Sequence, residues 1–413
     1  MQYYRFPEGK IWKLLFALFL LLQLYVTRSG MSATLIGFLP SQILMLGLIF
    51  ALGVLFLWKN KGQWKQIFTD IRLAAAFAFA CVFLIPMVCK QDWQLMYITI
   101  LMGMLLAVLL SYFVTLGETA KTYVLVLCVL AVYSLLATYV LRRPVDTGVL
   151  PVPRFFNGAG YEFYFFGLAN VSVEHVASRN FGILREPGVY QFFLLIALYL
   201  TNYEISWQRS RSMWIANGIL GVTLLSTQAT GGVIALGLFV VVVFFEKKMY
   251  QNKAVLWIAI LGAAAAAVIV VWSFIQRNAI YSFIYNTLLE KFINRTDSVT
   301  ERADGIVWNL TLFFRNPIFG AKLAQVLHGV NNNTSSTLIL FSGAGVLAGV
   351  VHILGWIALV WKRERNLIWK LGLLAVLFMG FNTQNLTWDL YFWLFPTMAL
   401  LERGITLLKR ERK

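Results

Sequence analysis

The feature that most constrains this chain is the repetition of long apolar runs along its whole length. Of its 413 residues, 60% are hydrophobic and only 13% are charged, whereas soluble proteins carry about 25% charged residues. A helix needs about 20 apolar residues to span a bilayer, and many of these runs approach that length. The strands of an outer-membrane barrel would be about half as long and would alternate. The sequence therefore predicts an all-α polytopic membrane protein.

We predict twelve transmembrane helices. The runs cover residues 11–28, 34–58, 72–89, 94–116, 122–141, 187–204, 213–228, 231–246, 254–275, 335–361, 367–383 and 389–402. Lysine and arginine recur in every second connection and in the C-terminal tail, and the positive-inside rule places those segments in the cytoplasm. With an even number of spans, both termini are expected there, in the cytoplasmic membrane of a bacterium. This rule also accounts for the net charge of +17 without a nucleic acid partner.

Two long connections stand out in what is otherwise a single membrane domain over residues 1–413. They cover 142–187 and 276–334, and the predicted topology places both on the extracytoplasmic side. Long ordered loops commonly carry function. In the second loop, apolar residues at 306, 307, 310, 313 and 314 have helical spacing. We expect the two loops to contribute short amphipathic helices, of the kind that lie at a membrane interface.

Both loops are rich in arginine, which is costly at membrane depth and therefore indicates function. Arg185 and Glu186 stand directly before Pro187, a residue suited to the first turn of a helix. A guanidinium group binds phosphate through two parallel hydrogen bonds. The chain lacks a P-loop, a dinucleotide-binding loop, metal-ligand spacing and the common hydrolase motifs. These observations indicate an anionic, membrane-borne substrate such as a lipid-linked pyrophosphate, with no cofactor and no metal.

At two places the chain resembles a known family. The stretch Arg179…Gly182…Arg185-Glu186-Pro187-Gly188 ahead of a span looks like the Glu-Pro-Gly stretch of bacterial O-antigen and capsule polymerases. The second loop is similar to a region shared by O-antigen polymerases and ligases. Its matching residues are Arg302…Trp308, then Phe313-Phe-Arg-Asn-Pro317-Ile-Phe-Gly320, then Asn331-Asn-Asn-Thr334 before a span with Gly343 and Gly345.

The resemblance implies a GT-C-like membrane glycosyltransferase of polysaccharide biosynthesis, serving lipopolysaccharide or capsule. It would move a growing glycan from undecaprenyl pyrophosphate to a sugar hydroxyl of another lipid-linked repeat unit, at the outer face of the membrane and without a metal. Its partners would be that lipid-linked oligosaccharide and membrane lipid, with a chain-length regulator as an optional protein partner.

The resemblance also implies roles for individual residues. Arg185 and Arg302 would hold the pyrophosphate, with Arg179 and Arg295 as helpers. His328 or Glu186 would serve as the base that accepts the proton of the acceptor hydroxyl. Tyr161, Trp308 and Asn333 are the candidate contacts to the glycan.

Three alternatives stay open. An O-antigen ligase would hand the glycan to lipid A core or to another surface acceptor. The ligase pattern, however, places Asn332 where a histidine is expected, and asparagine cannot act as a base. A peptidoglycan polymerase would need an outer-loop aspartate, for which Asp297 and Asp304 are candidates. A lipid-linked oligosaccharide flippase has a similar number of spans, but we find no paired halves in this sequence.

Overall fold

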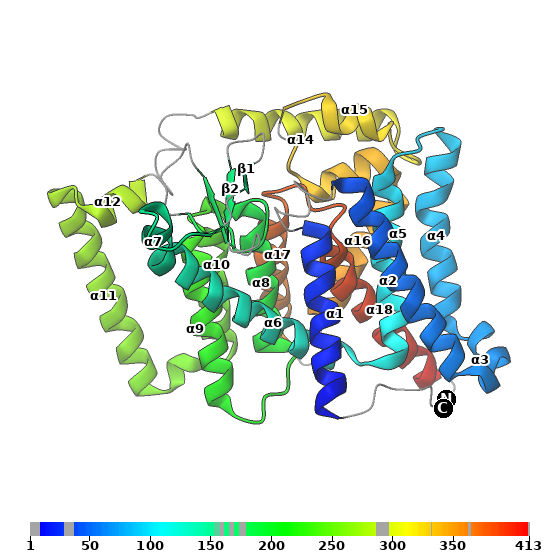
Figure 1. Ribbon diagram of the computed structural model, residues 1–413, viewed down its shortest axis with the longest axis horizontal. Helices are drawn as coiled ribbons and strands as arrows, with labels where there is room; N and C mark the ends of the chain where they lie inside the picture. Colours follow the sequence, from blue (N-terminus) through cyan, green and yellow to red (C-terminus); the bar gives the residue numbers. More distant parts are fainter. Residues whose placement is uncertain are drawn as a thin grey trace.

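The chain folds into a bundle of long helices, with a layer of shorter elements across one end (Figure 1). The computed structural model describes residues 9–28, 37–152, 155–156, 161–164, 169–172, 179–285, 297–331, 333–361 and 365–411. A helix lies on each of the predicted spans. These helices are α1 (Lys10–Arg28), α2 (Phe38–Lys59), α4 (Ile71–Cys89), α5 (Leu95–Phe113), α6 (Leu116–Leu136), α8 (Pro187–Tyr203), α9 (Ser210–Ser226), α10 (Thr230–Glu246), α11 (Lys253–Gln276), α16 (Ser336–Val360), α17 (Leu367–Phe381) and α18 (Leu390–Glu411).

Shorter elements connect them. They are η2 (Lys61–Gln63), α3 (Trp64–Phe68), the π-helical turn η3 (Ala137–Leu141), α7 (Arg142–Asp146), β1 (Phe155–Phe156), β2 (Tyr161–Tyr164), β3 (Ala169–Ser172), η4 (Met249–Gln251), α12 (Ala279–Ile284), α14 (Asp297–Arg315) and α15 (Leu323–His328).

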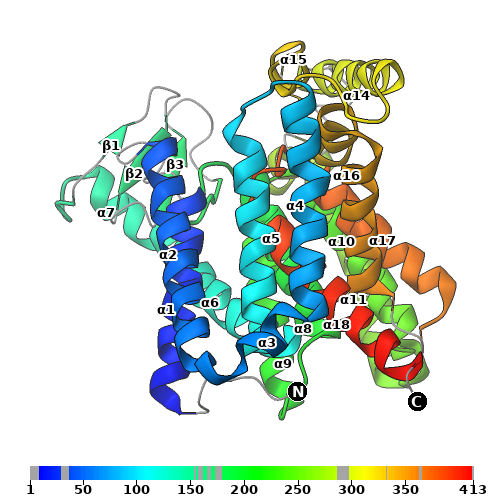
Figure 2. The ribbon, with the colours of Figure 1, turned by 90° about the vertical axis from the view of Figure 1, so that its right-hand side faces the viewer.

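Within the described residues, six helices are long and apolar enough to cross a membrane. They are Leu39–Lys59, Ile71–Cys89, Leu95–Phe113, Leu116–Asp146, Lys253–Gln276 and Ser336–Val360. Two apolar helices, α10 and α17, are shorter. The start of α1 and the end of α18 lie at the same end of the bundle, opposite to α14 (Figures 1 and 2). The predicted membrane character is therefore confirmed.

The centre of the bundle is α8. All of its residues from Pro187 to Thr201 are buried, and α6, α9, α10 and α17 pack around it. A helix that is apolar on every side is suited to this position. Because lipid tails are as apolar as these side chains, close packing rather than exclusion of water holds such helices together. The helix that begins directly after Glu186 is thus enclosed by the rest of the bundle.

The two long loops lie at one end of the bundle, as α7, α12, α14 and α15 show in Figure 1. The first loop differs from the expectation of amphipathic helices. Its described part contains the five-residue α7 and an antiparallel sheet in the order β1-β2-β3. Phe155 pairs with Phe163, and Tyr161 pairs with Ser172. The β-branched and aromatic residues of this loop favour strands when they are not spaced to form one face of a helix.

The predicted helix in the second loop is present as α14, which lies across the ends of the long helices (Figure 1). Most of its predicted apolar face is turned away from the bundle, since Val307 is 64% and Phe314 75% exposed, whereas Phe313 packs against Phe341 of α16. The inward face contains Gly305, Asn309 and Leu312, all of them buried. An amphipathic helix whose apolar side is unpacked is suited to lying in the membrane interface.

The helix α16 is broken at Gly345, whose φ of 84° and ψ of 179° are not helical. The segment that follows α14 lies in this break. The amide of Ala321 donates to the carbonyl of Ser342 at 2.6 Å, and the amide of Val346 donates to the carbonyl of Pro317 at 2.9 Å. These bonds satisfy backbone groups that the break would otherwise leave unpaired. The segment around Phe313–Gly320 and the span with Gly343 and Gly345, on which the resemblance in the second loop rests, therefore lie side by side and are joined by hydrogen bonds.

Gly345→Ala is expected to lower the free energy of unfolding by at least about 2 kcal/mol, because this backbone region is essentially restricted to glycine. A Cβ atom at this position would also lie 1.9 Å from the carbonyl oxygen of Ile318. The midpoint of thermal unfolding in detergent, followed by tryptophan fluorescence, measures the effect.

The matched control is Gly237→Ala in α10, where a Cβ atom would meet nothing within 4 Å. Alanine favours a helix interior over glycine by about 0.5–1 kcal/mol, so this variant should keep or slightly raise the midpoint. Equal midpoints for the two variants would show that the break in α16 is not a constraint on the fold.

Candidate functional site

A polar cavity of about 200 Å³ lies at the α14 end of the bundle. Segments from four parts of the chain line it: the start of α8 and the residues before it, the start of α10, the start of α14, and the turn between α17 and α18. The lining residues are Arg179, Glu186, Pro187, Gly188, Gln191, Ala229, Thr230, Gly231, Arg302, Thr383 and Gln384. The structure thus brings together three of the predicted site residues, Arg179, Glu186 and Arg302.

The segment before α8 is held in place by Asn180, which is buried. Its side-chain amide donates to the hydroxyls of Ser134 and Ser226, both at 3.0 Å, and its oxygen accepts from the amide of Gly182 at 2.9 Å. The neighbouring Arg179 donates from Nη2 to the carbonyl of Gln228 at 2.8 Å. Gln228 has a φ of 51°, a left-handed conformation that is uncommon outside glycine. These contacts tie Arg179 to the turn that precedes α10.

Arg302 reaches the cavity from the first part of α14. It is partly buried, and burial lowers the pKa of its guanidinium group. Because the ordinary pKa of arginine lies above 12, the group stays positively charged at neutral pH. Arg302 and Arg179 therefore supply two positive charges to the cavity, and Glu186 supplies one negative charge.

Two helices begin at the cavity wall, α8 at Pro187 and α10 at Thr230. Neither the residue before α8, Glu186, nor the residue before α10, Ala229, caps its helix with a side-chain hydrogen bond. The first amides of a helix have no partner within the helix, and its N-terminus carries a partial positive charge. Both helix ends therefore add to the preference of the cavity for an anion.

The rest of the wall is polar and uncharged. Gln191, which is 2% exposed, donates from Nε2 to the hydroxyl of Thr383 at 2.6 Å. That hydroxyl in turn donates to the carbonyl of Gly380 at 2.9 Å. Gln384 lies against Gly188, where a Cβ atom would come within 2.3 Å of its side-chain nitrogen. Amide and hydroxyl groups of this kind are suited to hydrogen bonding with sugar hydroxyls.

Arg185 lies beside the cavity but does not line it. Its Nε atom is 3.6 Å from Oε1 of Glu186, and about a third of each side chain is exposed. Its described link to the cavity is this contact with the carboxylate of Glu186.

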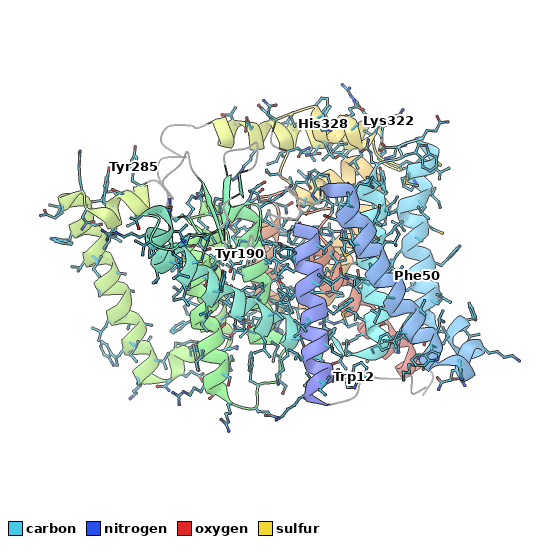
Figure 3. The ribbon with its side chains drawn as sticks, viewed as in Figure 1. Trp12, Phe50, Tyr190, Tyr285, Lys322 and His328 are labelled. Atoms are coloured by element: carbon cyan, nitrogen blue, oxygen red, sulfur yellow. The ribbon has the colours of Figure 1, made fainter. Side chains whose placement is uncertain are left out.

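The remaining predicted residues lie elsewhere. His328 ends α15, on the outer layer near Lys322, as Figure 3 shows, and Trp308 donates from Nε1 to the carbonyl of Gln325 at 3.2 Å. Asn333 is buried. Its Oδ1 accepts a hydrogen bond from Nδ2 of Asn309 at 2.7 Å, and its Nδ2 donates to the carbonyl of Val326 at 2.8 Å. These contacts give Asn333 and Trp308 a place in the packing of the second loop. Arg295, Asn332 and the side chain of Tyr161 lie outside the described residues.

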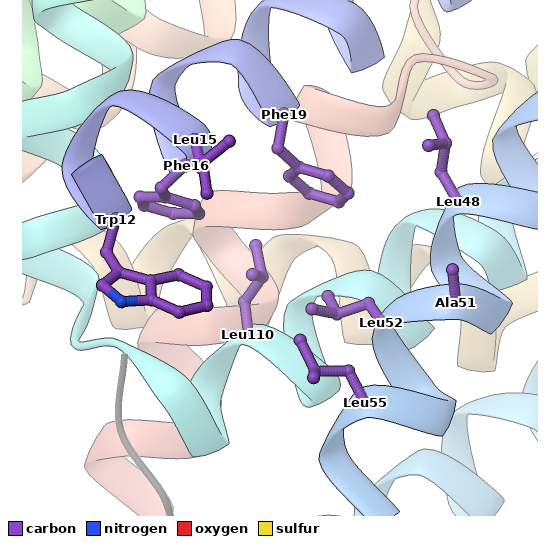
Figure 4. A pocket seen from close by; sticks show the side chains of 9 residues that line it. All are labelled: Trp12, Leu15, Phe16, Phe19, Leu48, Ala51, Leu52, Leu55 and Leu110. Atoms are coloured by element: carbon purple, nitrogen blue, oxygen red, sulfur yellow. The ribbon is translucent and has the colours of Figure 1, made fainter. Parts of the chain in front are cut away.

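A larger hollow of about 240 Å³ lies between α1, α2 and α5 (Figure 4). It is lined by apolar side chains, among them Trp12, Phe16 and Leu52, and it has no titratable group. Within the described ranges, no group of three or more histidine, cysteine, aspartate or glutamate residues lies close enough to hold a metal ion. Of these two hollows, only the polar cavity is lined by charged side chains.

Arg302→Ala is expected to weaken the binding of inorganic pyrophosphate by roughly tenfold or more, because a hydrogen bond to a charged group contributes about 1.5–3 kcal/mol. Arg315→Ala is the matched control, since Arg315 is an exposed arginine in the last turn of the same helix. Titration calorimetry on the purified protein gives both affinities. Equal losses in the two variants would contradict an anion site in the cavity.

Comparison with protein-family models, with curated proteins and with solved structures gave no significant match to this chain.

Proposed function

We propose that this protein is a polysaccharide polymerase of the bacterial cytoplasmic membrane. It would transfer a growing glycan from undecaprenyl pyrophosphate to a sugar hydroxyl of another lipid-linked repeat unit at the outer face. The observation that supports this most strongly is the meeting of Arg179, Glu186 and Arg302 in one polar cavity. The resemblance of the surrounding motifs to O-antigen polymerases supplies the reaction class.

The topology belongs to the same proposal. All twelve apolar runs would cross the membrane, with both termini in the cytoplasm and the α14 end of the bundle outside. The helices on each predicted span and the common end of α1 and α18 support this arrangement (Figures 1 and 2). The cavity would then lie near the outer surface of the membrane, where a lipid-linked repeat unit is available for polymerisation.

The cavity suits the two ends of such a substrate. The two arginines and the two uncapped helix ends would bind the pyrophosphate, and the amide and hydroxyl groups of Gln191, Thr383 and Gln384 would contact the adjoining sugar. The exposed apolar side of α14, with Val307 and Phe314, would lie in lipid beside the isoprenoid chain. A volume of about 200 Å³ is smaller than a typical pocket for a whole ligand, so only the reacting part of the substrate would enter.

In the reaction, the bond between the anomeric carbon of the donor sugar and the pyrophosphate oxygen breaks. The acceptor hydroxyl forms the new bond to that carbon, and its proton passes to a base. Glu186 is the carboxylate of the cavity and is the residue we assign to this step. Arg179 and Arg302 would stabilise the charge that develops on the leaving pyrophosphate. His328, which does not line the cavity, would take no part in the transfer.

The test is an in vitro assay with the purified protein and the undecaprenyl-pyrophosphate-linked repeat unit alone. Wild type should produce a ladder of longer lipid-linked glycans without a nucleotide sugar. Arg302→Ala and Glu186→Gln should reduce the rate by about a hundredfold or more, as expected for groups that act on the transition state. His328→Ala should keep the wild-type rate.

Two outcomes would replace the proposal. Transfer of glycan only after addition of a lipid A core acceptor would identify a ligase. Absence of any transfer, together with passage of the lipid-linked substrate across liposome membranes, would identify a flippase.

A further inference from the structure

A charged pair outside the cavity joins the turn between α4 and α5 to the second loop. Lys90 donates from Nζ to the hydroxyl of Tyr97 at 2.8 Å, to the carbonyl of Ala321 at 2.9 Å and to the carbonyl of Gly343. Asp92 lies 4.0 Å from the same nitrogen and accepts from the amide of Leu323 at 2.6 Å. The two side chains are only 10% and 5% exposed. Three segments, around residues 90–97, 321–323 and 343, therefore meet at one ammonium group.

The carbonyl of Gly343 belongs to the last turn of the first half of α16, just before the break at Gly345. The C-terminal end of a helix has carbonyls without partners in the helix and carries a partial negative charge. A buried cation with three N–H donors fits this position, because it satisfies several carbonyls and interacts favourably with the helix dipole. Lys90 thus caps a helix end that exists only because α16 is broken.

The capped break is also where α14 is attached. The hydroxyl of Ser342 donates to Oδ1 of Asn309 at 2.7 Å, and Asn309 lies two helical turns after Arg302 on the same helix. Lys90 bonds Ala321, in the connection between α14 and α15, and Asp92 bonds Leu323, the first residue of α15. α14 is therefore attached to the broken helix in two ways, through its own Asn309 and through the segment that follows it.

We propose that Lys90 is a positioning residue, whose side-chain hydrogen bonds hold α14 over the cavity and so set the position of Arg302. This inference rests on the contribution of α14 to the cavity and not on the reaction that the cavity performs.

The charge of Lys90 can be tested because burial lowers its pKa to about 8, with Asp92 acting in the opposite direction. Asp92 and Tyr97 are the titratable groups that the described structure places against Lys90; the part of α16 before the break has none, and Lys322 is exposed. The amine that forms above pH 8 keeps two N–H donors for the carbonyls of Ala321 and Gly343, and its lone pair can accept from the hydroxyl of Tyr97. Since the pKa falls on folding, this group makes the folded state more rather than less stable as pH rises from about 8 to about 10.4.

The experiment measures hydrogen exchange of the backbone over residues 302–323, in the purified protein in lipid nanodiscs, at pH values on both sides of 8. Lys90→Met removes the charge and the donors at similar length, and Lys90→Arg keeps the charge at every pH. The matched control is Lys322→Met, which changes a neighbouring exposed lysine. Affinity for inorganic pyrophosphate is measured in parallel at each pH.

We expect exchange over these residues to be roughly tenfold faster in Lys90→Met, and pyrophosphate affinity to fall about tenfold, the effect of losing charge-assisted hydrogen bonds. In wild type, protection of these residues should rise as the pH increases above 8, because opening exposes Lys90 to water and takes up a proton that the folded state no longer holds; Lys90→Arg should show no such rise. The ionisation of pyrophosphate itself changes the affinities of wild type and of Lys90→Arg equally, so it cancels in the ratio of the two affinities. A merely structural lysine would not produce a pH profile that arginine removes.

The proposal is overturned if Lys90→Met exchanges like wild type, or if the protection of residues 302–323 has the same pH dependence in Lys90→Arg as in wild type. If wild type binds no pyrophosphate at all, the anion site fails while hydrogen exchange still decides the role of Lys90. If neither variant folds, the exchange of wild type across pH 8 decides: unchanged protection of residues 302–323 would contradict the proposal.

Discussion

The closure of the break in α16 is the interaction on which the described site depends. A helix interrupted inside a membrane protein leaves amides and carbonyls that neither lipid nor water can satisfy, so protein groups must replace them. Here the chain itself does so, because the residues from Pro317 to Ala321 bond to both sides of Gly345. The same residues connect α14 to α15. The local requirement for paired backbone groups thus fixes the place of the helix that brings Arg302 to the cavity.

The second determinant is the start of α8. This helix is buried along almost its whole length, so the residues that precede it are held rigidly. Arg179 and Glu186 enter the cavity from this segment, and Arg302 enters from α14. One wall is therefore part of the rigid centre of the bundle, and the opposite wall is a helix attached from the outside. In the proposed function, this arrangement would bind the anionic head group between the two walls, beside the lipid-linked chain.

The sequence predicts the helices well and the site in part. Apolar runs of membrane-spanning length predict helices for a simple reason, since few other structures satisfy the backbone in lipid. Arg179, Glu186 and Arg302 were also predicted, because charged residues next to spans are costly and rarely incidental. Gln191 and Gln384 were missed, although the polar stretch around Thr383 at the end of a span was a usable signal.

Other features of the structure could not be predicted from the sequence, for physical reasons. Helical spacing locates the apolar face of α14 but does not show whether protein or lipid covers it, because in a membrane both are apolar. The role of Asn333 depends on its bonds to Asn309 and Val326, which no sequence pattern specifies. The strands of the first loop form by pairing with one another, and such pairing is set by contacts distant in sequence.

We propose that the cavity between α8, α10 and α14 holds the pyrophosphate of a lipid-linked glycan. The most direct measurement is an electron cryomicroscopy structure of the protein in nanodiscs with bound undecaprenyl pyrophosphate. We expect density for the two phosphates within hydrogen-bonding distance of the guanidinium groups of Arg179 and Arg302. The isoprenoid chain should leave the cavity beside the apolar side of α14. Phosphate density at another place on the bundle, with the cavity empty, would contradict it.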